Sequence, residues 1–272
     1  MPEPLPEYRV TARNTAVGSE NRVHDSAEAR RRGFRGAVVP GVAVYAYLTE
    51  PLVAALGEAW LRRGTAHVRF RRPVIEGDAV TVAGAITARE PAGLAAELRA
   101  RTPVEGDCAL LAATLPAGTP APVNPALYTE RPLPAERPPV SRDLLASLPT
   151  LGSPETRYDA AEAENWLQAV GDPLPLYRGP AGWVHPAAYL VQANRALDRN
   201  VRLDFWLHVE SRVRHLGGAR VGQRLRTLGR VRSLYERKGR EFVELDLLIL
   251  ADGAPAAHVL HTAIYLLPEP RT

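Results

Sequence analysis

Residues 17–45 read V-G-S-E-N-R-V-H-D-S-A-E-A-R-R-R-G-F-R-G-A-V-V-P-G-V-A-V-Y, a polar segment that leads into an apolar helix. The polar part contains His24, a side chain that exchanges protons near neutral pH. Gly33 and Gly41 mark a turn and the point where the apolar run begins. The stretch therefore predicts a candidate reactive histidine in a loop beside the N-terminus of a buried helix.

The composition is typical of a folded chain without disulfides. Of the 272 residues, 46% are hydrophobic, which is enough for one large core or two modest ones. The single cysteine, Cys108, cannot form an internal disulfide, and no apolar run approaches the roughly 20 residues that cross a bilayer. The first residues lack the basic and apolar regions of a signal peptide. We expect a cytoplasmic protein with no membrane partner.

The formal net charge of +4 raises the question of nucleic-acid binding. Lys238 is the only lysine, and the arginines are scattered rather than gathered in a stripe with aromatic residues. We expect no nucleic-acid partner, and an acidic small molecule fits the charge equally well. Histidines in the second half lack metal-ligand spacing and companion cysteines, so no metal site is expected.

A proline-rich segment divides the chain. Residues 116–154 contain many prolines, which disfavour regular helix and interior strand. We expect a linker there, with one domain over residues 1–115 and a second over residues 155–272, each near the common size of a domain.

The two halves carry the same order of expected elements. In the first, an apolar helix over Val42–Leu56 precedes alternating strands from Thr65, with a turn near Glu76–Asp78. In the second, a helix over Ala187–Leu197 precedes strands between Phe205 and Tyr265. This repetition predicts an α+β protein in which an antiparallel sheet wraps around a helix in each half. Pairing between the two sheet edges would make a pseudo-dimer within one chain.

The segment around His24 resembles the signature of the MaoC-like (R)-specific enoyl-CoA hydratases and dehydratases, which have the hotdog fold. That signature is approximately S-G-D-x-N-P-L-H-x-D-x-x-x-A-x-x-x-G-F-x-x-P-I-x-H-G. The residues in register are Asn21, His24, Ala29, Gly33, Phe34 and Gly41, with Val38 at the isoleucine position. A weaker resemblance covers residues 70–78, F-R-R-P-V-I-E-G-D. The resemblance implies a double hotdog fold, an acyl-CoA or acyl-carrier-protein thioester substrate from fatty acid or polyketide metabolism, and no separate cofactor.

The resemblance also implies roles for three residues. His24 would be the general base and acid, and Asn21 would orient the water or the thioester. The amide of Gly41, at a helix N-terminus, would stabilise charge on the thioester oxygen. Ser19 stands where the family has an aspartate, and Pro40 where it has a histidine. The usual carboxylate is therefore missing.

Several residues could compensate for that loss. Asp25 and Glu20 lie beside His24 in the sequence, and Gln192 could reach the site from the second half. Asp25 is at the same time the expected N-cap of the following helix, with Glu28 completing a capping box. Ser19 is expected to complete a turn rather than to act as a nucleophile.

The second half contains a degraded copy of the motif. Asp172 occupies the aspartate position, Tyr177 the histidine position and Pro186 that of Gly41. Because proline has no N–H, the oxyanion donor is lost. We expect this second site to be vestigial and the second half to be a structural partner.

The remaining candidates concern substrate binding. Arg30 and Arg31 could meet the phosphates of coenzyme A at a tunnel mouth, or form a solvated helix face. Tyr45 could contact the substrate, although packing is the favoured interpretation.

Three functions follow as hypotheses. The first is a hydro-lyase that interconverts enoyl and 3-hydroxyacyl thioesters. The second is a non-catalytic acyl-thioester binder, or a dehydratase subunit that needs a partner. The third is an acyl-CoA thioesterase. A homodimer and a complex with a partner hotdog subunit both stay open.

Overall fold

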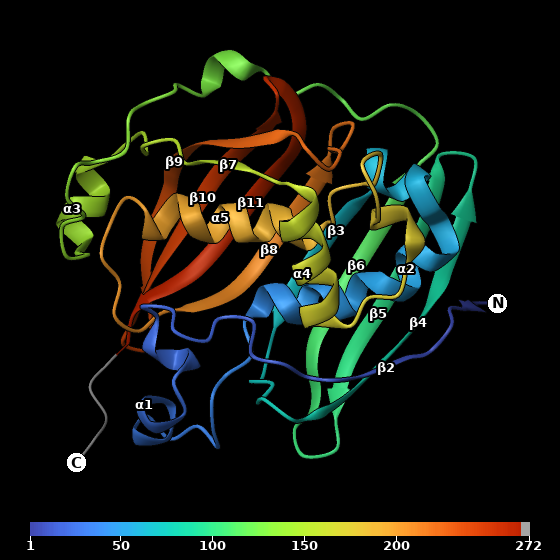
Figure 1. The fold of residues 1–272 in the computed structure, drawn as a ribbon, viewed down its shortest axis with the longest axis horizontal. Coiled ribbons are helices and arrows are strands. Elements are labelled where there is room, and N and C mark those ends of the chain that lie inside the picture. Colours follow the sequence, from blue (N-terminus) through green and yellow to red (C-terminus); the bar gives the residue numbers. More distant parts are fainter. Residues whose placement is uncertain (268–272) are drawn as a thin grey trace.

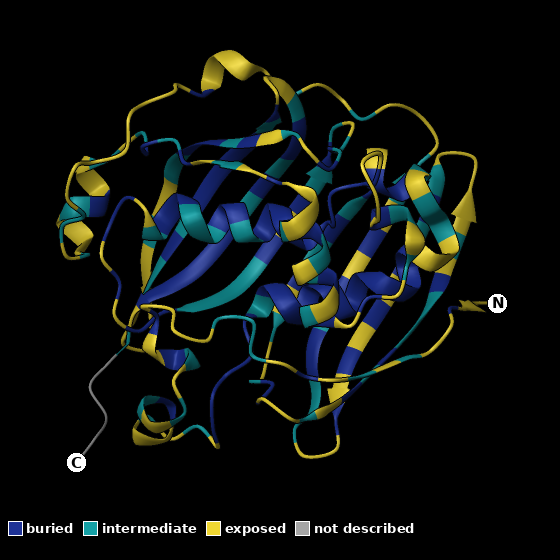
Figure 2. Cartoon of the chain, in the orientation of Figure 1, coloured by how far each residue is buried: buried dark blue, intermediate teal, exposed yellow. Residues whose placement is uncertain are grey.

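The computed structural model describes residues 1–267 and shows two central helices on one face of a large sheet (Figure 1). The apolar helix of the first half is α2 (Gly41–Arg63), and its counterpart is α5 (Ala187–Asp198). Every residue of α2 from Val42 to Val53 is buried, so this part of the helix is enclosed on all sides, whereas Ala54 and Ala55 are exposed. Figure 2 shows both helices with large buried stretches. The positive φ of Gly57 interrupts α2 close to the expected end at Leu56, and the helix then continues to Arg63.

The strands of residues 1–267 all belong to one 11-stranded sheet. The first half contributes β1 (Glu3–Pro4), β2 (Tyr8–Thr11), β3 (Thr65–Phe70), β4 (Ala79–Glu90), β5 (Gly93–Thr102) and β6 (Gly106–Pro116). The second contributes β7 (Glu155–Arg157), β8 (Leu207–His215), β9 (Arg224–Arg237), β10 (Arg240–Ala251) and β11 (Ala254–Leu266). The spatial order is β1-β4-β5-β6-β3-β8-β11-β10-β9-β7, and β2 also pairs with β4. The expected antiparallel pairing is confirmed, but the meander in each half covers only three strands, β4-β5-β6 and β9-β10-β11. The strand that directly follows each central helix pairs with the last strand of its half, β3 with β6 and β8 with β11.

The two halves join where β3 pairs with β8. This pairing is antiparallel and runs from Thr65 opposite Arg214 to Arg69 opposite Glu210. It removes one exposed edge from each half-sheet, as the sequence predicted. Because β3 and β8 directly follow the central helices, the pairing also brings α2 and α5 together (Figure 1).

The segment between the halves contains more regular structure than its prolines predicted. It includes a 3-10 turn, η2 (Pro125–Leu127), and the short helix α3 (Arg142–Ser147). Ser141 caps α3 by accepting a hydrogen bond from the Leu144 amide at 3.1 Å. The expectation that this segment excludes regular helix is therefore wrong at α3, because a good N-cap offsets the prolines nearby. The division into two domains at this segment stays a prediction.

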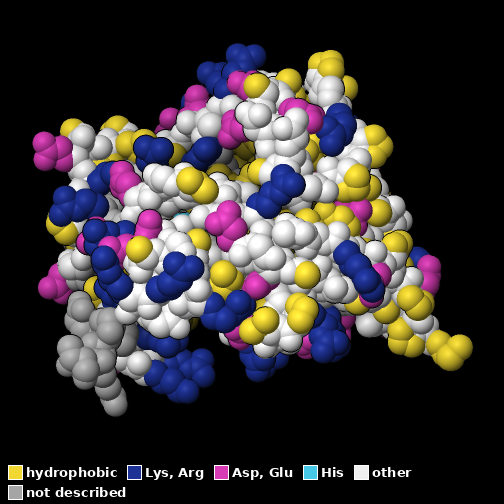
Figure 3. All heavy atoms as spheres, turned by 60° about the horizontal axis from the view of Figure 1, so that its bottom comes forward, with side chains coloured by type: hydrophobic (Ala, Val, Ile, Leu, Met, Phe, Trp, Pro, Cys, Tyr) yellow, Lys and Arg dark blue, Asp and Glu magenta, His cyan; other side chains and the backbone are white. Residues whose placement is uncertain are grey.

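Further helices and 3-10 turns lie outside the two central helices α2 and α5. They are η1 (Arg22–His24), α1 (Ser26–Arg31), α4 (Ala160–Val170) and η3 (Pro175–Tyr177). Within residues 1–267, no helix is both long and apolar enough to cross a membrane. Basic and acidic side chains are interspersed over the face shown in Figure 3.

Candidate active site

His24 lies at the junction of two capped turns. Asn21 caps η1 by accepting from the Val23 amide at 3.4 Å, and Asp25 caps α1 by accepting from the Glu28 amide at 2.9 Å. The capping role expected of Asp25 is present in the structure. The polar residues around His24 therefore fix the local backbone, and this holds His24 at the end of η1.

The tautomer of His24 follows from one contact. Its Nδ1 atom lies 2.6 Å from the carbonyl oxygen of Val38. A carbonyl can only accept, so Nδ1 carries the proton and Nε2 keeps its lone pair. Burial lowers the pKa of His24, and the bond to Val38 offsets this effect only in part. His24 is therefore neutral near pH 7 and has Nε2 available as a base.

Asn21 links the His24 loop to the second half. Its Nδ2 donates to the Trp206 carbonyl at 3.0 Å, and its Oδ1 accepts from the Trp206 amide at 3.2 Å. This two-way contact fixes the orientation of the amide. Nδ2 consequently lies 3.4 Å from Nε2 of His24 and can only donate toward it. The half that lacks His24 thus sets its surroundings.

Two cavities meet at His24. One has a volume of about 510 Å³ and the other of about 890 Å³. The residues that line both are Asn21, His24, Pro40, Asn194 and Trp206. A ligand that extends through both cavities would pass His24 at their boundary.

The smaller cavity is basic. Its described lining contains no carboxylate and has the arginines Arg32, Arg71, Arg72 and Arg240. Gly41, at the start of α2, lies on its wall together with His208 from β8. Pro40 supplies no capping hydrogen bond to α2, so the first amides of the helix are not capped by it. An anionic group, or an oxygen that gains charge during a reaction, suits this cavity.

His208 belongs to a row of hydrogen-bonded side chains that no pattern in the sequence indicated. Its Nε2 lies 2.8 Å from the Ser211 hydroxyl, which lies 3.0 Å from Nδ1 of His261. Burial lowers the pKa of His261 to about 3, and burial together with His261 lowers that of His208 well below its usual value. Both rings are therefore neutral. Alternation along β8 places His208 in the strand but gives no sign that it faces the His24 cavity.

The larger cavity lies between α4, α5 and the loop before His24, and its charges are largely paired. Arg137 contacts Glu20 at 2.8 Å, and Arg195 lies 3.7 Å from Glu162. The apolar part of its wall includes Trp166, Val191 and Leu203. An apolar chain with few charges fits this space.

The expected replacements for the missing carboxylate do not contact His24. Glu20 is held by Arg137, and Ser19 Oγ accepts from the Asn21 amide at 3.2 Å. Gln192 lines the larger cavity and donates to Thr156 at 3.3 Å. Within residues 1–267, no Asp or Glu side chain forms a hydrogen bond with His24.

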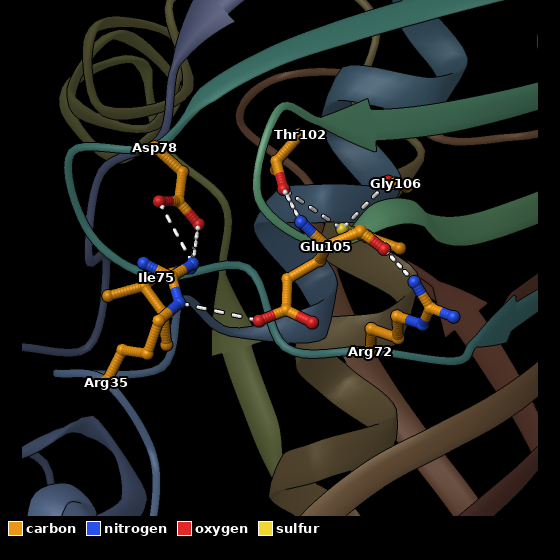
Figure 4. A network of polar contacts seen from close by, with 8 residues as sticks. Arg35, Arg72, Ile75, Asp78, Thr102, Glu105 and Gly106 are labelled. Carbon is orange, nitrogen blue, oxygen red and sulfur yellow. Dashed lines mark hydrogen bonds and ion pairs between the residues drawn. The ribbon is translucent and has the colours of Figure 1, made fainter.

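The loop that carries Val38 is anchored by an arginine. Arg35 forms ion pairs with Asp78 at 3.0 Å and Glu105 at 3.4 Å, and Arg72 donates to the Glu105 carbonyl (Figure 4). These contacts tie the segment before α2 to the β3–β4 turn and the β5–β6 hairpin. They hold the Val38 carbonyl where it orients His24.

Comparison with known proteins places the fold. No protein-family model matches this sequence, and no curated protein matches it. A solved structure described as a MaoC domain protein dehydratase from Chloroflexus aurantiacus aligns with a TM-score of 0.67 and 11% identity, over 98% of this chain and 95% of its own. A conserved hypothetical protein from Mycobacterium tuberculosis, described as a double hotdog, gives 0.64 and 14% over 96% of each chain. This chain has a double hotdog fold.

The structural neighbours of this double hotdog protein differ in described activity. They include MaoC-like dehydratases, as the sequence resemblance implied. A protein described as an oleoyl thioesterase from Lactobacillus plantarum aligns with a TM-score of 0.57 and 15% identity, over 97% of this chain and 98% of its own. Identities this low show the shared fold and leave the reaction open.

In the second hotdog, the degraded motif forms a closed core cluster. Asp172 Oδ2 lies 3.2 Å from Nε2 of His185, whose Nδ1 accepts from the Ala187 amide at 3.1 Å. The Tyr177 ring lies 4.7 Å from the His185 ring. All three side chains are buried, and none lines either cavity at His24. His185 was missed as a partner of Asp172, although it stands at the position of Pro40 in the repeat.

The basic residues at the double hotdog cavity differ from those expected. Arg31 pairs with Glu28 at 2.6 Å, and Arg30 donates to the Arg35 carbonyl at 3.3 Å. Neither lines a cavity at His24, and Tyr45 is fully buried in the core. The sequence does contain an indication of two of the lining arginines. Arg71 and Arg72 lie in the run F-R-R-P, which begins at the last residue of β3.

Proposed function

We propose that this protein is a hydro-lyase that interconverts enoyl and 3-hydroxyacyl groups carried as thioesters. The observation that carries the proposal is the unprotonated Nε2 of His24 at the boundary of two cavities, beside the N-terminus of α2. A base and an amide donor in one site match the chemical needs of hydration. The likeness to dehydratases of the same fold supports this choice.

The site would work through one histidine. Nε2 of His24 takes a proton from water as the water oxygen bonds to Cβ of the enoyl group. The carbon–carbon double bond opens toward Cα, and the thioester oxygen gains the charge, which the Gly41 amide stabilises. The imidazolium then returns its proton to Cα. One water has been added, and His24 is again neutral.

The two cavities would divide the substrate between them. The phosphates of a coenzyme A or phosphopantetheine carrier would bind the arginines of the smaller cavity. The acyl chain would extend into the larger cavity, whose wall is more apolar and whose charges are paired.

Thioester hydrolysis is the second candidate. Structural likeness to proteins described as thioesterases favours it. In that reaction, the water activated by His24 would attack the thioester carbonyl rather than Cβ. The C–S bond would then break, and the imidazolium would return its proton to the departing thiolate.

The test is a direct assay with crotonyl-CoA and longer enoyl-CoA substrates. Hydration is supported if the wild type consumes the enoyl-thioester absorbance and forms 3-hydroxyacyl-CoA, and if His24→Asn does neither. Release of free thiol indicates hydrolysis instead. Binding without either product would show a non-catalytic acyl-thioester binder and overturn the proposal.

A further inference from the structure

We propose that Trp166, on α4, closes one end of the larger cavity and sets the longest acyl chain that the site accepts. This inference rests on the proposed function, because it takes the acyl part of the thioester to lie in that cavity. Trp166 would contact the far end of the chain and take no part in proton transfer. It is therefore a specificity residue, and the second hotdog supplies it.

The larger cavity lies between α4 and α5, which run in opposite directions. Both helices contribute residues to its wall. Glu162, in the first turn of α4, lies 3.7 Å from Arg195, in the last turn of α5. Further along α4, the ring of Trp166 lies 6.2 Å from the ring of His185, just before α5 begins. The cavity therefore has two ends, one at Arg195 and one at Trp166.

The end at Arg195 is charged. Arg137 donates to the carbonyl of Asp198, the last residue of α5, at 2.9 Å, and it pairs with Glu20 at 2.8 Å. All of these residues line the cavity. A methylene chain placed against these ion pairs would remove water from them, which costs free energy. An acyl chain is therefore disfavoured at this end.

The end at Trp166 is uncharged. Among residues 1–267, no charged side chain lines the cavity on α4 after its first turn or on α5 before its last turn. Ala169 and Ala188 contribute small apolar side chains to the wall there. An apolar chain gains free energy by leaving water for such a surface. An acyl chain that starts at His24 therefore extends toward Trp166.

Trp166 separates this end from the closed second motif. Its indole lines the cavity and also packs against the buried core, with its ring inclined at 63° to that of His185. His185, Asp172 and Tyr177 are buried and line neither cavity. A chain that grows toward the second motif therefore meets the indole before it reaches these side chains.

Removal of the indole should lengthen the cavity. An apolar space of about 150 Å³ inside a protein can stay dry and bind benzene, a ring smaller than an indole. Each methylene group that moves from water into such a space strengthens binding roughly fourfold. Alanine has the highest helix propensity, so Trp166→Ala should keep α4 helical. The variant should accept chains that are longer by a few methylene groups.

The experiment compares Trp166→Ala and Trp166→Phe with Gln168→Ala, an exposed change on α4 outside both cavities. The kcat/KM is measured for enoyl-CoA substrates from crotonyl-CoA to hexadecenoyl-CoA, and each value is divided by the crotonyl-CoA value. We expect this ratio to fall beyond one chain length in the wild type. Trp166→Ala should raise it roughly tenfold for the next longer substrates. Trp166→Phe should raise it less, and Gln168→Ala should leave it unchanged.

The ratio is independent of how much enzyme is folded, because both substrates are measured on the same sample. A lower melting temperature of Trp166→Ala therefore does not affect the test. A second measurement avoids turnover altogether. Calorimetry with the non-reactive thioethers S-butyl-CoA and S-hexadecyl-CoA should show that Trp166→Ala tightens binding of the longer compound relative to the shorter one.

Other outcomes overturn the inference. An unchanged ratio in Trp166→Ala, with unchanged relative binding of the two thioethers, would show that Trp166 does not limit the chain. A wild-type enzyme whose ratio does not fall up to hexadecenoyl-CoA would show the same. If the wild type hydrates none of the substrates, the proposed function fails, and the relative binding of the thioethers still decides the role of Trp166.

Discussion

Nδ1 of His24 donates to the carbonyl of Val38 at 2.6 Å, and this contact determines which ring nitrogen can act as a base. The two residues are 14 positions apart, on either side of the helix α1. A loop that folds back on itself therefore sets the chemistry of the site. The contact leaves Nε2 unprotonated at the boundary of the two cavities, with Nδ2 of Asn21 3.4 Å away.

The first prediction concerns the pH dependence of activity. Burial lowers the pKa of His24, so more acid is needed to protonate Nε2 than for an exposed histidine. We expect kcat/KM for hydration to stay level as the pH falls through the usual histidine value of about 6.5 and to decline only below it. NMR titration of the His24 ring, assigned with His24→Asn, gives the same pKa independently. A decline that begins above pH 7 would contradict a neutral, buried base.

The second prediction concerns Gly41. A Cβ at this position would lie 3.1 Å from the Phe70 ring and 3.2 Å from Nδ1 of His208. Gly41→Ala should therefore displace the start of α2 slightly and lower kcat roughly tenfold or more, because the oxyanion donor moves. Gly118→Ala is the control, since a Cβ there meets no atom within 4 Å. Equal kcat in both variants would argue against an oxyanion donor at Gly41.

The third prediction concerns the basic cavity. The double variant Arg71→Gln and Arg240→Gln should raise KM for an enoyl-CoA about tenfold or more and reduce its dependence on salt, because charge-assisted bonds to phosphate are lost. Arg30→Gln with Arg31→Gln is the matched control, because these arginines lie outside both cavities. Steady-state kinetics at low and high ionic strength measures both effects. A larger rise in KM in the control would indicate that the phosphates bind the arginines of α1 instead.

The fourth prediction concerns the closed second motif. Asp172→Ala leaves the N–H of the buried, neutral His185 without its acceptor and should lower the free energy of unfolding by about 1 to 3 kcal/mol. The kcat of the folded protein should not change, because Asp172 lies outside both cavities. Denaturant unfolding and kinetics at low temperature test this pair of results. Asp143→Ala, an exposed change on α3, should alter stability by less than about 0.5 kcal/mol. A loss of kcat in stable Asp172→Ala protein would show that the second motif still takes part in turnover.

Local patterns in the sequence predicted much of the fold. Alternation predicted the strands after each central helix, and the turn at Glu76–Asp78 has the Asp78 side chain accepting from the Ile75 amide at 2.9 Å. The short helix α3 was missed because a cap signal at Ser141 competes with many prolines nearby. Such signals lie within a few residues of the structure they specify, which is why they can be found without coordinates.

The sequence by itself predicted the repeated order of helix and strands, a loop that carries His24, and an apolar helix that begins near Gly41, because each of these follows from local spacing along the chain. Only the tertiary structure decided which residues complete the site. Trp206 orients Asn21, and Asn194 and His208 face the cavities of His24, because pairing of β3 with β8 brings the second half against the first. These contacts join residues more than 150 positions apart, as the 185 positions between Asn21 and Trp206 illustrate. Such distances leave no periodic signal in the sequence, since they depend on how two sheets meet.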